Sequence, residues 1–129
     1  MSAEAAVAVR LATLLRADAA LMGRVNAVFE GPAARMTLPY LALGTVAAND
    51  WGTKDRAGAE VVVRVTWAAP DGPGDGVVGA RVAAVVQGLR GVSAGWELVS
   101  ARLVRSRGEH DKAGRWAQGF DVRVRCLVV

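Results

Sequence analysis

The stretch Glu60-Val-Val-Val-Arg-Val-Thr-Trp67 has the period-2 pattern of a half-buried β-strand. One face of this strand carries Val61, Val63, Val65 and Trp67. The other face carries Glu60, Val62, Arg64 and Thr66. β-branched residues suit a pleated, partly buried surface. We therefore predict that this stretch is a central strand and that the rest of the chain is organised around it.

Two helical segments are predicted before this strand. Ser2 suits the N-cap of a helix from about Ala3 to Arg16, whose apolar residues recur at helical spacing. Asp18 suits the cap of a second helical piece with apolar positions from Leu21 to Phe29, ended by Gly31-Pro32. We expect the first helix to pack on a sheet through its apolar stripe.

A first strand and a polar loop are predicted between the helices and the central strand. The strand is Leu38–Gly44, with Pro39 near its start. The loop runs from Ala47 to Gly58 and contains Trp51. An aromatic ring in so polar a loop is either tucked back on the core or offered to a partner, and the sequence leaves both alternatives open.

The second half of the chain predicts a turn, a helix and a hairpin. The turn is Pro70–Gly76, and Asp75 suits the N-cap of a helix from Gly76 to about Leu89. Strands are predicted at Trp96–Arg107 and Trp116–Val129, joined by a charged turn. They form an antiparallel hairpin that carries many arginines: Arg102, Arg105, Arg107, Arg115, Arg123 and Arg125.

The predicted order is α, α, β, β, α, β, β. Short connections between strands favour an α+β fold: an antiparallel sheet of about four strands with two to three helices packed on one face. A length of 129 residues fits one domain covering residues 1–129.

The charge balance is basic and rests on arginine. The chain has 16 basic and 12 acidic residues, a net charge of +4 and a pI near 10.2. Attraction to nucleic acid or to acidic protein surfaces is one interpretation, and a bias in overall composition is the other. Cys126 is the only cysteine, so no intramolecular disulfide is possible, which fits a reducing compartment. We expect no signal peptide, no membrane partner and a cytoplasmic location.

No catalytic constellation is visible in the sequence. His110, the only histidine, lies in a charged turn, and Cys126 lies on the apolar face of the last strand. The glycine-rich turn before the third helix lacks the Lys-Ser/Thr of a phosphate-binding loop. We therefore expect no catalytic residue, no metal and no cofactor, and a protein that is not an enzyme.

Nearly the full length of the chain resembles the small tail-completion or tail-terminator proteins of long-tailed bacteriophages and gene transfer agents. The resemblance rests on the order of five pieces: Leu38-Pro-Tyr-Leu-Ala-Leu-Gly44, Asp50-Trp-Gly-Thr53, Val63-Arg-Val-Thr-Trp67, Leu98-Val-Ser-Ala-Arg-Leu-Val104 and Gly114-Arg-Trp116. No single piece is diagnostic; their order and spacing carry the likeness.

This resemblance implies a structural protein of a phage-like particle. Such proteins form a ring, usually of six copies, on the head-proximal end of the tail tube. The ring ends tube polymerisation and joins the tail to the head through the head-completion (stopper) protein. DNA passes through its lumen without sequence recognition. The implied location is the cytoplasm during assembly and then the tail of the particle.

A ring contact needs two different surfaces on one subunit. We expect the Trp51 loop and the arginine-bearing hairpin to supply them from opposite sides, with Arg123 and Arg125 pairing with acidic groups such as Asp50 or Asp55 of a neighbour. The candidate interface residues are Asp50, Trp51, Lys54, Asp55, Arg64, Arg123 and Arg125.

Two other functions remain open from the residues alone. One is a nucleic-acid-binding module that uses the arginine-rich C-terminal hairpin. The other is a small α+β ligand-binding domain with a pocket between helix and sheet.

Overall fold

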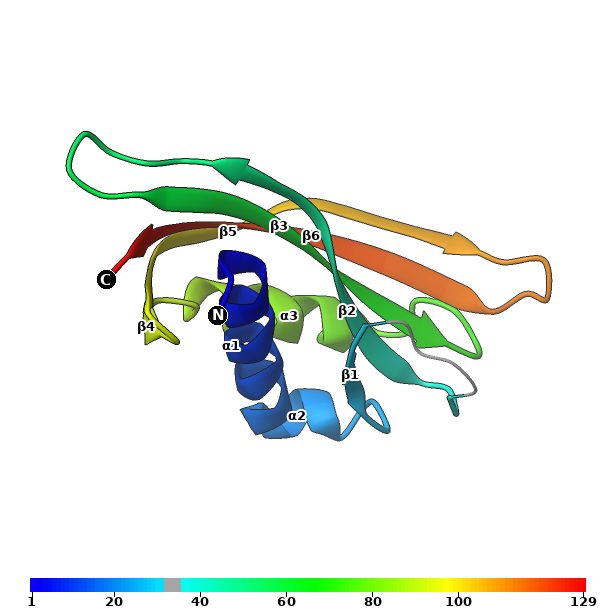
Figure 1. Ribbon diagram of the computed structural model, residues 1–129. Coiled ribbons are helices and arrows are strands. Elements are labelled where there is room, and N and C mark those ends of the chain that lie inside the picture. Colours follow the sequence, from blue (N-terminus) through cyan, green and yellow to red (C-terminus); the bar gives the residue numbers. More distant parts are fainter. Residues whose placement is uncertain (32–35) are drawn as a thin grey trace.

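The computed structural model describes residues 1–31 and 36–129, which form a curled sheet with helices on one face (Figure 1). The sheet has six strands in the order β1-β2-β3-β6-β5-β4. Its four long strands are antiparallel to one another: β2 (Tyr40–Asp50), β3 (Gly58–Ala69), β6 (Trp116–Val128) and β5 (Trp96–His110). These are the four predicted strands, so the α+β class and the antiparallel centre of the sheet are confirmed.

Two short strands were not predicted and flank the four long ones. β1 (Val28–Glu30) pairs parallel to β2, and β4 (Gly91–Ser93) pairs antiparallel to β5. Each has three residues, too few for a period-2 pattern to reveal it. The prediction of about four antiparallel strands is therefore too small by two strands, one of them parallel.

Three helices lie on the same side of the sheet: α1 (Ala3–Ala17), α2 (Ala19–Met22) and α3 (Val77–Gln87). The Ser2 hydroxyl accepts a hydrogen bond from the Ala5 N–H at 3.2 Å, so the predicted cap is confirmed. The third helix differs in one detail. Its N-cap is Gly76, with φ of 80°, and Asp75 instead accepts a hydrogen bond from the Val77 N–H at 3.2 Å.

The core lies between the helices and one face of the sheet. Val61, Val63 and Val65 are fully buried and Trp67 nearly so, as the alternation in β3 predicts. The core also contains buried residues of α3, β2 and β5, together with the facing residues of β6 and the stripe of α1: Phe120, Val122, Val124, Cys126, Leu11 and Leu15. Such burial is the main stabilising term of the fold.

The second helix is much shorter than predicted, because the chain after Met22 turns to join the sheet. The Asn26 side chain donates hydrogen bonds to the carbonyls of Thr37 and Leu38, both at 3.1 Å. The Leu41 N–H donates to the Ala27 carbonyl at 3.0 Å. Pairing with β2 therefore replaces the expected helical turns up to Phe29. The predicted end of this helix at Gly31-Pro32 lies partly outside the described residues.

β2 is longer than predicted and takes up part of the expected loop. Its residues from Ala47 to Asp50 pair with β3 after a bulge between Thr45 and Ala47. All residues from Gly44 to Asp50 are exposed, so ladder hydrogen bonds rather than burial hold this part. The β2–β3 hairpin and the β5–β6 hairpin project beyond the helices at opposite ends of the sheet (Figure 1).

Candidate functional site: the uncovered face of the sheet

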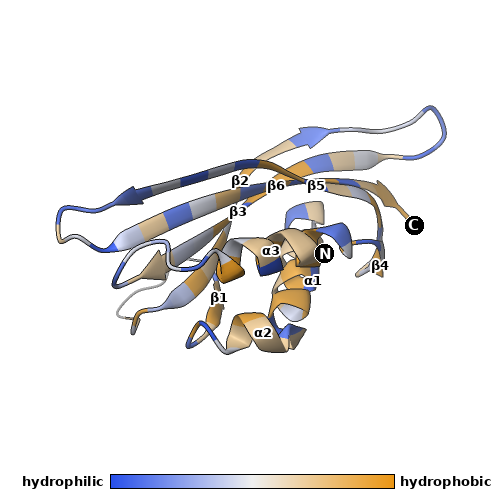
Figure 2. Cartoon of the chain, turned by 180° about the vertical axis from the view of Figure 1, so that it is seen from behind, coloured by the Kyte–Doolittle hydropathy of each residue, from blue (hydrophilic) through white to orange (hydrophobic). Residues whose placement is uncertain are grey.

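The helices leave one face of the long strands open, and we call it the uncovered face. On β3 it comprises Glu60, Val62, Arg64 and Thr66. The cross-strand register places beside them Arg125, Arg123, Asp121 and Gly119 of β6, and Ser100, Arg102, Arg105, Arg107 and Glu109 of β5. The long strands alternate hydrophilic and hydrophobic residues, whereas the helices are largely hydrophobic (Figure 2). Arginine is thus the dominant residue of the uncovered face.

An ion pair lies at the centre of this face. Arg64 donates two hydrogen bonds to the Asp121 carboxylate, from Nε at 2.7 Å and from Nη2 at 3.2 Å. The Asp121 side chain is 12% exposed and that of Arg64 is 48% exposed. The hydrogen bond to Asp121, with its negative charge, raises the pKa of Arg64 above its usual range. The pair fixes β3 to β6 on the side opposite the core.

A second pair anchors Trp51. The Arg125 Nε donates to the Glu60 carboxylate at 2.8 Å, and the Arg125 guanidinium carbon lies 5.5 Å from the centre of the Trp51 ring. Trp51 is therefore folded back onto the sheet through a cation–π contact. We expected the Trp51 loop and the arginine-bearing hairpin to lie on opposite sides, and for Arg125 this is wrong. β6 pairs with β3 as far as the start of β3, which places Arg125 beside the Trp51 loop.

Four arginines of the uncovered face have no carboxylate within 4.0 Å among the described residues. They are Arg102, Arg105, Arg107 and Arg123. The first three are exposed and the last is half-buried. Elsewhere on the described chain most arginines are paired: Arg16, Arg24, Arg56, Arg81 and Arg115 each have an acidic partner. Free positive charge is thus concentrated on the uncovered face.

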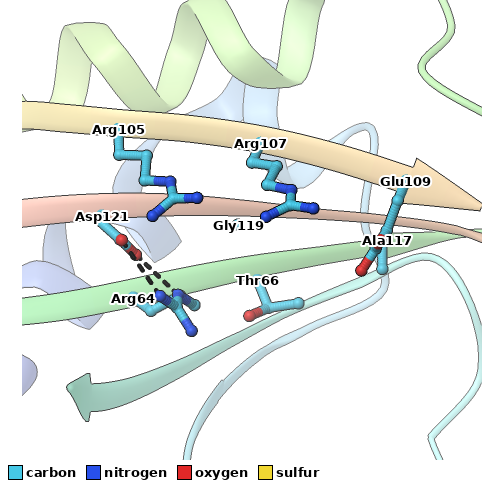
Figure 3. Close-up of a pocket in the computed structure, with 8 residues that line it drawn as sticks. All are labelled: Arg64, Thr66, Arg105, Arg107, Glu109, Ala117, Gly119 and Asp121. Atoms are coloured by element: carbon cyan, nitrogen blue, oxygen red, sulfur yellow. Dashed lines mark hydrogen bonds and ion pairs between the residues drawn. The ribbon is translucent and has the colours of Figure 1, made fainter.

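A hollow of about 430 Å³ lies on the uncovered face, over β3, β6 and β5 (Figure 3). Its lining residues are Arg64, Thr66, Arg105, Arg107, Glu109, Ala117, Gly119 and Asp121. Arg105 and Arg107 extend from β5 over β6 towards Gly119 (Figure 3). A Cβ at Gly119 would lie only 3.3 Å from the Arg64 Cδ, so the glycine keeps the floor of the hollow open. Cationic donors and a hydroxyl around an open floor suit an anion.

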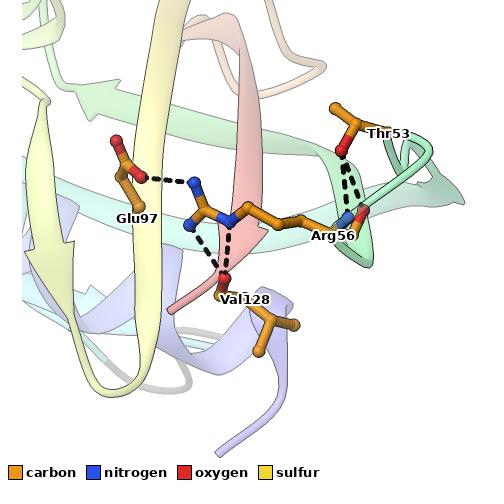
Figure 4. A network of polar contacts seen from close by, with 4 residues as sticks. All are labelled: Thr53, Arg56, Glu97 and Val128. Atoms are coloured by element: carbon orange, nitrogen blue, oxygen red, sulfur yellow. Dashed lines mark hydrogen bonds and ion pairs between the residues drawn. The ribbon is translucent and has the colours of Figure 1, made fainter.

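The tip of the β2–β3 hairpin is held by Arg56, which no pattern in the sequence singles out. Arg56 donates to the Val128 carbonyl from Nε at 3.0 Å and from Nη2 at 2.8 Å, and to Glu97 from Nη1 at 2.9 Å (Figure 4). The Thr53 hydroxyl accepts from the Arg56 N–H at 3.0 Å. These bonds join the tip to β5 and to the end of β6.

The seven candidate interface residues therefore fall into two groups. Arg64, Arg123 and Arg125 lie on the uncovered face, and Trp51 joins them through Arg125. Asp50, Lys54 and Asp55 are exposed at the tip of the β2–β3 hairpin. Asp121 was not predicted as a site residue. In the sequence it is an acid on the same strand face as Arg123 and Arg125. Its role as the partner of Arg64 follows only from the pairing of β3 with β6.

The remaining chemistry-bearing side chains do not converge. Burial raises the pKa of the Cys126 thiol to about 11. The exposed His110 ring lies edge-on to Trp116 with 5.0 Å between ring centres. No three His, Cys, Asp or Glu side chains are grouped to hold a metal ion within residues 1–31 and 36–129. In the same ranges, no helix has the length and apolar character to cross a membrane.

Two hollows among the described residues have linings from both a helix and the sheet, where the ligand-binding alternative places its pocket. One, of about 250 Å³, lies at the turn before α3, between Val78 of α3 and Trp67 and Ala69 of β3. The other measures about 260 Å³ and lies between α3 and β5. Its lining is Ala83, Val86, Gln87, Ala101, Arg102 and Leu103. Only Gln87 and Arg102 carry polar side chains there, too few convergent groups to orient a small ligand.

Comparison with known proteins finds similarity over almost the whole chain. The family described as "Tail completion protein gp17" matches residues 9–128. A chain of the solved structure described as "Virion of native gene transfer agent (GTA) particle" is 27% identical, with a TM-score of 0.74. That match covers 98% of this chain and 99% of the other. Among curated proteins, none matches.

Proposed function

Since the chain belongs to the tail completion protein gp17 family, we propose that it closes the head-proximal end of a tail tube. Copies of the chain form a ring, six in number, on the last ring of tube subunits. The ring ends tube polymerisation and presents a surface to the head-completion protein. DNA passes through its lumen. Residues 1–129 act as one tail-terminator-like domain, and the protein has no catalytic step.

The observation that carries this proposal is the agreement of two comparisons. The family match spans residues 9–128, and the structural match over 98% of the chain is to a component of a virion-like particle. A structural role in the tail follows from the family. The ring, the end of polymerisation and the passage of DNA are the finer steps that we propose. The same proposal places the protein in the cytoplasm during assembly and in the particle afterwards.

The shape of the subunit supports a ring contact. A heterologous contact that closes by rotation needs two different surfaces on each copy. The outer edge of β2 has a neighbour only at Leu41–Leu43, and the outer edge of β5 has one only at Trp96–Leu98. In the described residues the rest of both edges is unpaired, and an unpaired edge is a template for another chain. The two edges lie on opposite sides of the sheet and differ in sequence.

The residues proposed for protein contacts are those of the hairpin tip and its surroundings. Asp50, Lys54 and Asp55 are exposed and offer both signs of charge. Arg123 has no acidic partner among described residues and is the better candidate to meet a neighbour's carboxylate, because Arg125 already binds Glu60. Mixed charges of this kind favour correct register over raw affinity. Trp51, Arg64 and Arg125 contribute by holding the surface in shape.

An elongation assay tests the capping step. Tail tubes are incubated with the purified protein, fresh tube subunits are added, and the length distribution is measured by electron microscopy. We expect treated tubes to stop elongating at one end and untreated tubes to grow. The double variant Asp50→Lys/Asp55→Lys should cap poorly, whereas a matched reversal away from the tip of the β2–β3 hairpin, Glu4→Lys/Asp71→Lys, should cap normally. Equal growth with and without the protein would refute the proposal.

We do not propose the small-ligand alternative, because the hollow between α3 and β5 has few polar groups and, in the hollow before α3, Arg24 and Asp75 bind each other. The nucleic-acid alternative gains one supporting observation, the four arginines without acidic partners, and the next inference develops it within the ring.

A further inference from the structure

The uncovered face carries more positive charge than its own acids can neutralise. Six arginines share it with three carboxylates, those of Glu60, Asp121 and Glu109. Two of these acids are already bound to Arg125 and Arg64. The surplus is mostly local, because Arg16, Arg24 and Arg81 on the helical side are paired with acids. Only Arg10 of α1 and Arg90, which follows α3, have no carboxylate within 4.0 Å among the described residues of that side.

We infer that the uncovered face binds the phosphate backbone of double-stranded DNA and lines the lumen of the ring. The lumen assignment rests on the proposed function. The face opposite the uncovered face is packed against α1 and α3, so the uncovered face is the side of the sheet that is open to a partner. We place it towards the lumen because its unpaired arginines match the negative charge of DNA. The phosphate-binding step rests on the arginines alone and applies to the isolated subunit as well.

The spacing of the free arginines fits a phosphate backbone. Arg105 and Arg107 are two residues apart on β5, which places them roughly 7 Å apart along the strand. B-DNA has one phosphate per about 3.4 Å of helix axis on each strand. Because the backbone also winds around the axis, neighbouring phosphates of one strand lie farther apart than this axial rise, and such a pair of arginines can meet neighbouring phosphates of one strand. The hollow of about 430 Å³ beneath them has room for a phosphate group, and Thr66 offers a hydroxyl there.

The same face, in the part of the chain that the structure describes, has no free aromatic ring on which an unpaired base could stack. Its residues between the arginines are small, namely Val62, Thr66, Ser100 and Gly119. The Trp51 ring beside the face is occupied by Arg125. Backbone contacts without base contacts give no sequence preference, and stacking on single strands needs free aromatic rings. The exposed carboxylate of Glu109 in the hollow repels phosphate and weakens the contact with DNA. A weak contact suits DNA that slides through the ring.

Fluorescence anisotropy with a labelled 30-base-pair duplex tests the inference on the purified full chain. In the isolated subunit all four free arginines are available, Arg123 included, because no neighbouring subunit is present to bind it. Four phosphate contacts give a slope of log K against log salt of about −3.6, so affinity falls on the order of 100-fold between 50 and 200 mM salt. Arg105→Gln/Arg107→Gln should reduce the slope by about 1.8. The matched control Arg24→Gln/Arg90→Gln removes the same charge outside the uncovered face and should change the slope by less than about 0.5.

Three results would overturn the inference. The first is no DNA binding at 50 mM salt, and the second is an equal reduction of the salt slope in both double variants. The third is loss of tube capping in Arg105→Gln/Arg107→Gln with DNA affinity unchanged. The last result would assign the face to a protein contact. The capping assay is run on the same variants. Wild-type protein that binds DNA through this face but does not cap tubes would refute the proposed function and leave the phosphate-binding step standing.

Discussion

Replacing Asp121 by Asn should lower stability and raise DNA affinity at the same time. The substitution keeps the size of the side chain and removes the charge that Arg64 binds through two hydrogen bonds, at 2.7 and 3.2 Å. Arg105 is the register partner of Asp121 on the other side. The variant therefore leaves two arginines facing a neutral amide, and Arg64 becomes free for a phosphate.

The stability cost follows from the burial of the pair. Breaking a fully buried ion pair costs about 3–5 kcal/mol, and an exposed pair contributes about 0–1 kcal/mol. Asp121 is 12% exposed but Arg64 is 48% exposed, so solvent screens one partner. We expect a loss of about 2 kcal/mol, between the two limits. At about 2.1 cal/mol/K of unfolding entropy per residue, this lowers Tm by about 7 °C.

Thermal unfolding followed by circular dichroism measures this loss, and Glu60→Gln is the matched control. Glu60 and Arg125 are 23% and 36% exposed, with one hydrogen bond at 2.8 Å, so that variant should lose less than about 1 kcal/mol. DNA titration of Asp121→Asn should show a salt slope steeper by about 0.9. A Tm within about 2 °C of wild type, or a larger loss in Glu60→Gln, would refute the assignment of Asp121 as the central anchor of this face.

Three further predictions address the fold itself. A Cβ at Gly58 would lie 2.5 Å from the Cys126 carbonyl oxygen, so Gly58→Ala should cost about 2–4 kcal/mol in urea unfolding. Gly44→Ala, with nothing within 4 Å, should stay within about 1 kcal/mol of wild type; equal costs would contradict the close approach at Gly58. The hydrogen bond from Arg81 lowers the pKa of the Asp18 carboxyl. The ion pair therefore contributes to folding stability above the pKa of the unfolded state, about 3.9, and this contribution is lost as pH falls through the lower pKa of the folded state. Asp18→Asn should therefore be less stable by about 1 kcal/mol at pH 7 and close to wild type near pH 2, and a gap that widens in acid would contradict this. Cys126, buried and with its pKa raised to about 11, should react with a thiol reagent at pH 8 at least about 100-fold more slowly in native protein than in urea, and equal rates would place it at the surface.

The centre of the fold was predictable because burial leaves a periodic signature. Alternating valines in β3 and apolar spacing in α1 placed both elements correctly, and their buried faces are those predicted. The same logic failed where burial is absent. The segment from Ala47 to Asp50 is an exposed strand held by its ladder to β3, and its residues show no periodic pattern. Apolar residues after Met22 suggested a helix, but pairing with β2 took them into the sheet.

The candidate site was predictable in kind but not in detail. The sequence shows many arginines on one hairpin, and it shows which of them share a strand face. Which arginines are free depends on neighbours that are distant in sequence. Asp121 meets Arg64 across 57 residues and Glu60 meets Arg125 across 65. Arg56 binds the carbonyl of Val128 across 72 residues. Only the strand order β3-β6-β5 reveals these partners and the hollow between them.

The central claim is that copies of this chain close one end of a tail tube as a ring. Negative-stain imaging of purified tail tubes mixed with the protein, with class averages of both tube ends, tests it most directly. The account predicts added density with an open lumen at one end of the tube only, showing sixfold symmetry in end-on views. Unmodified tube ends, or protein bound along the tube wall, would contradict it.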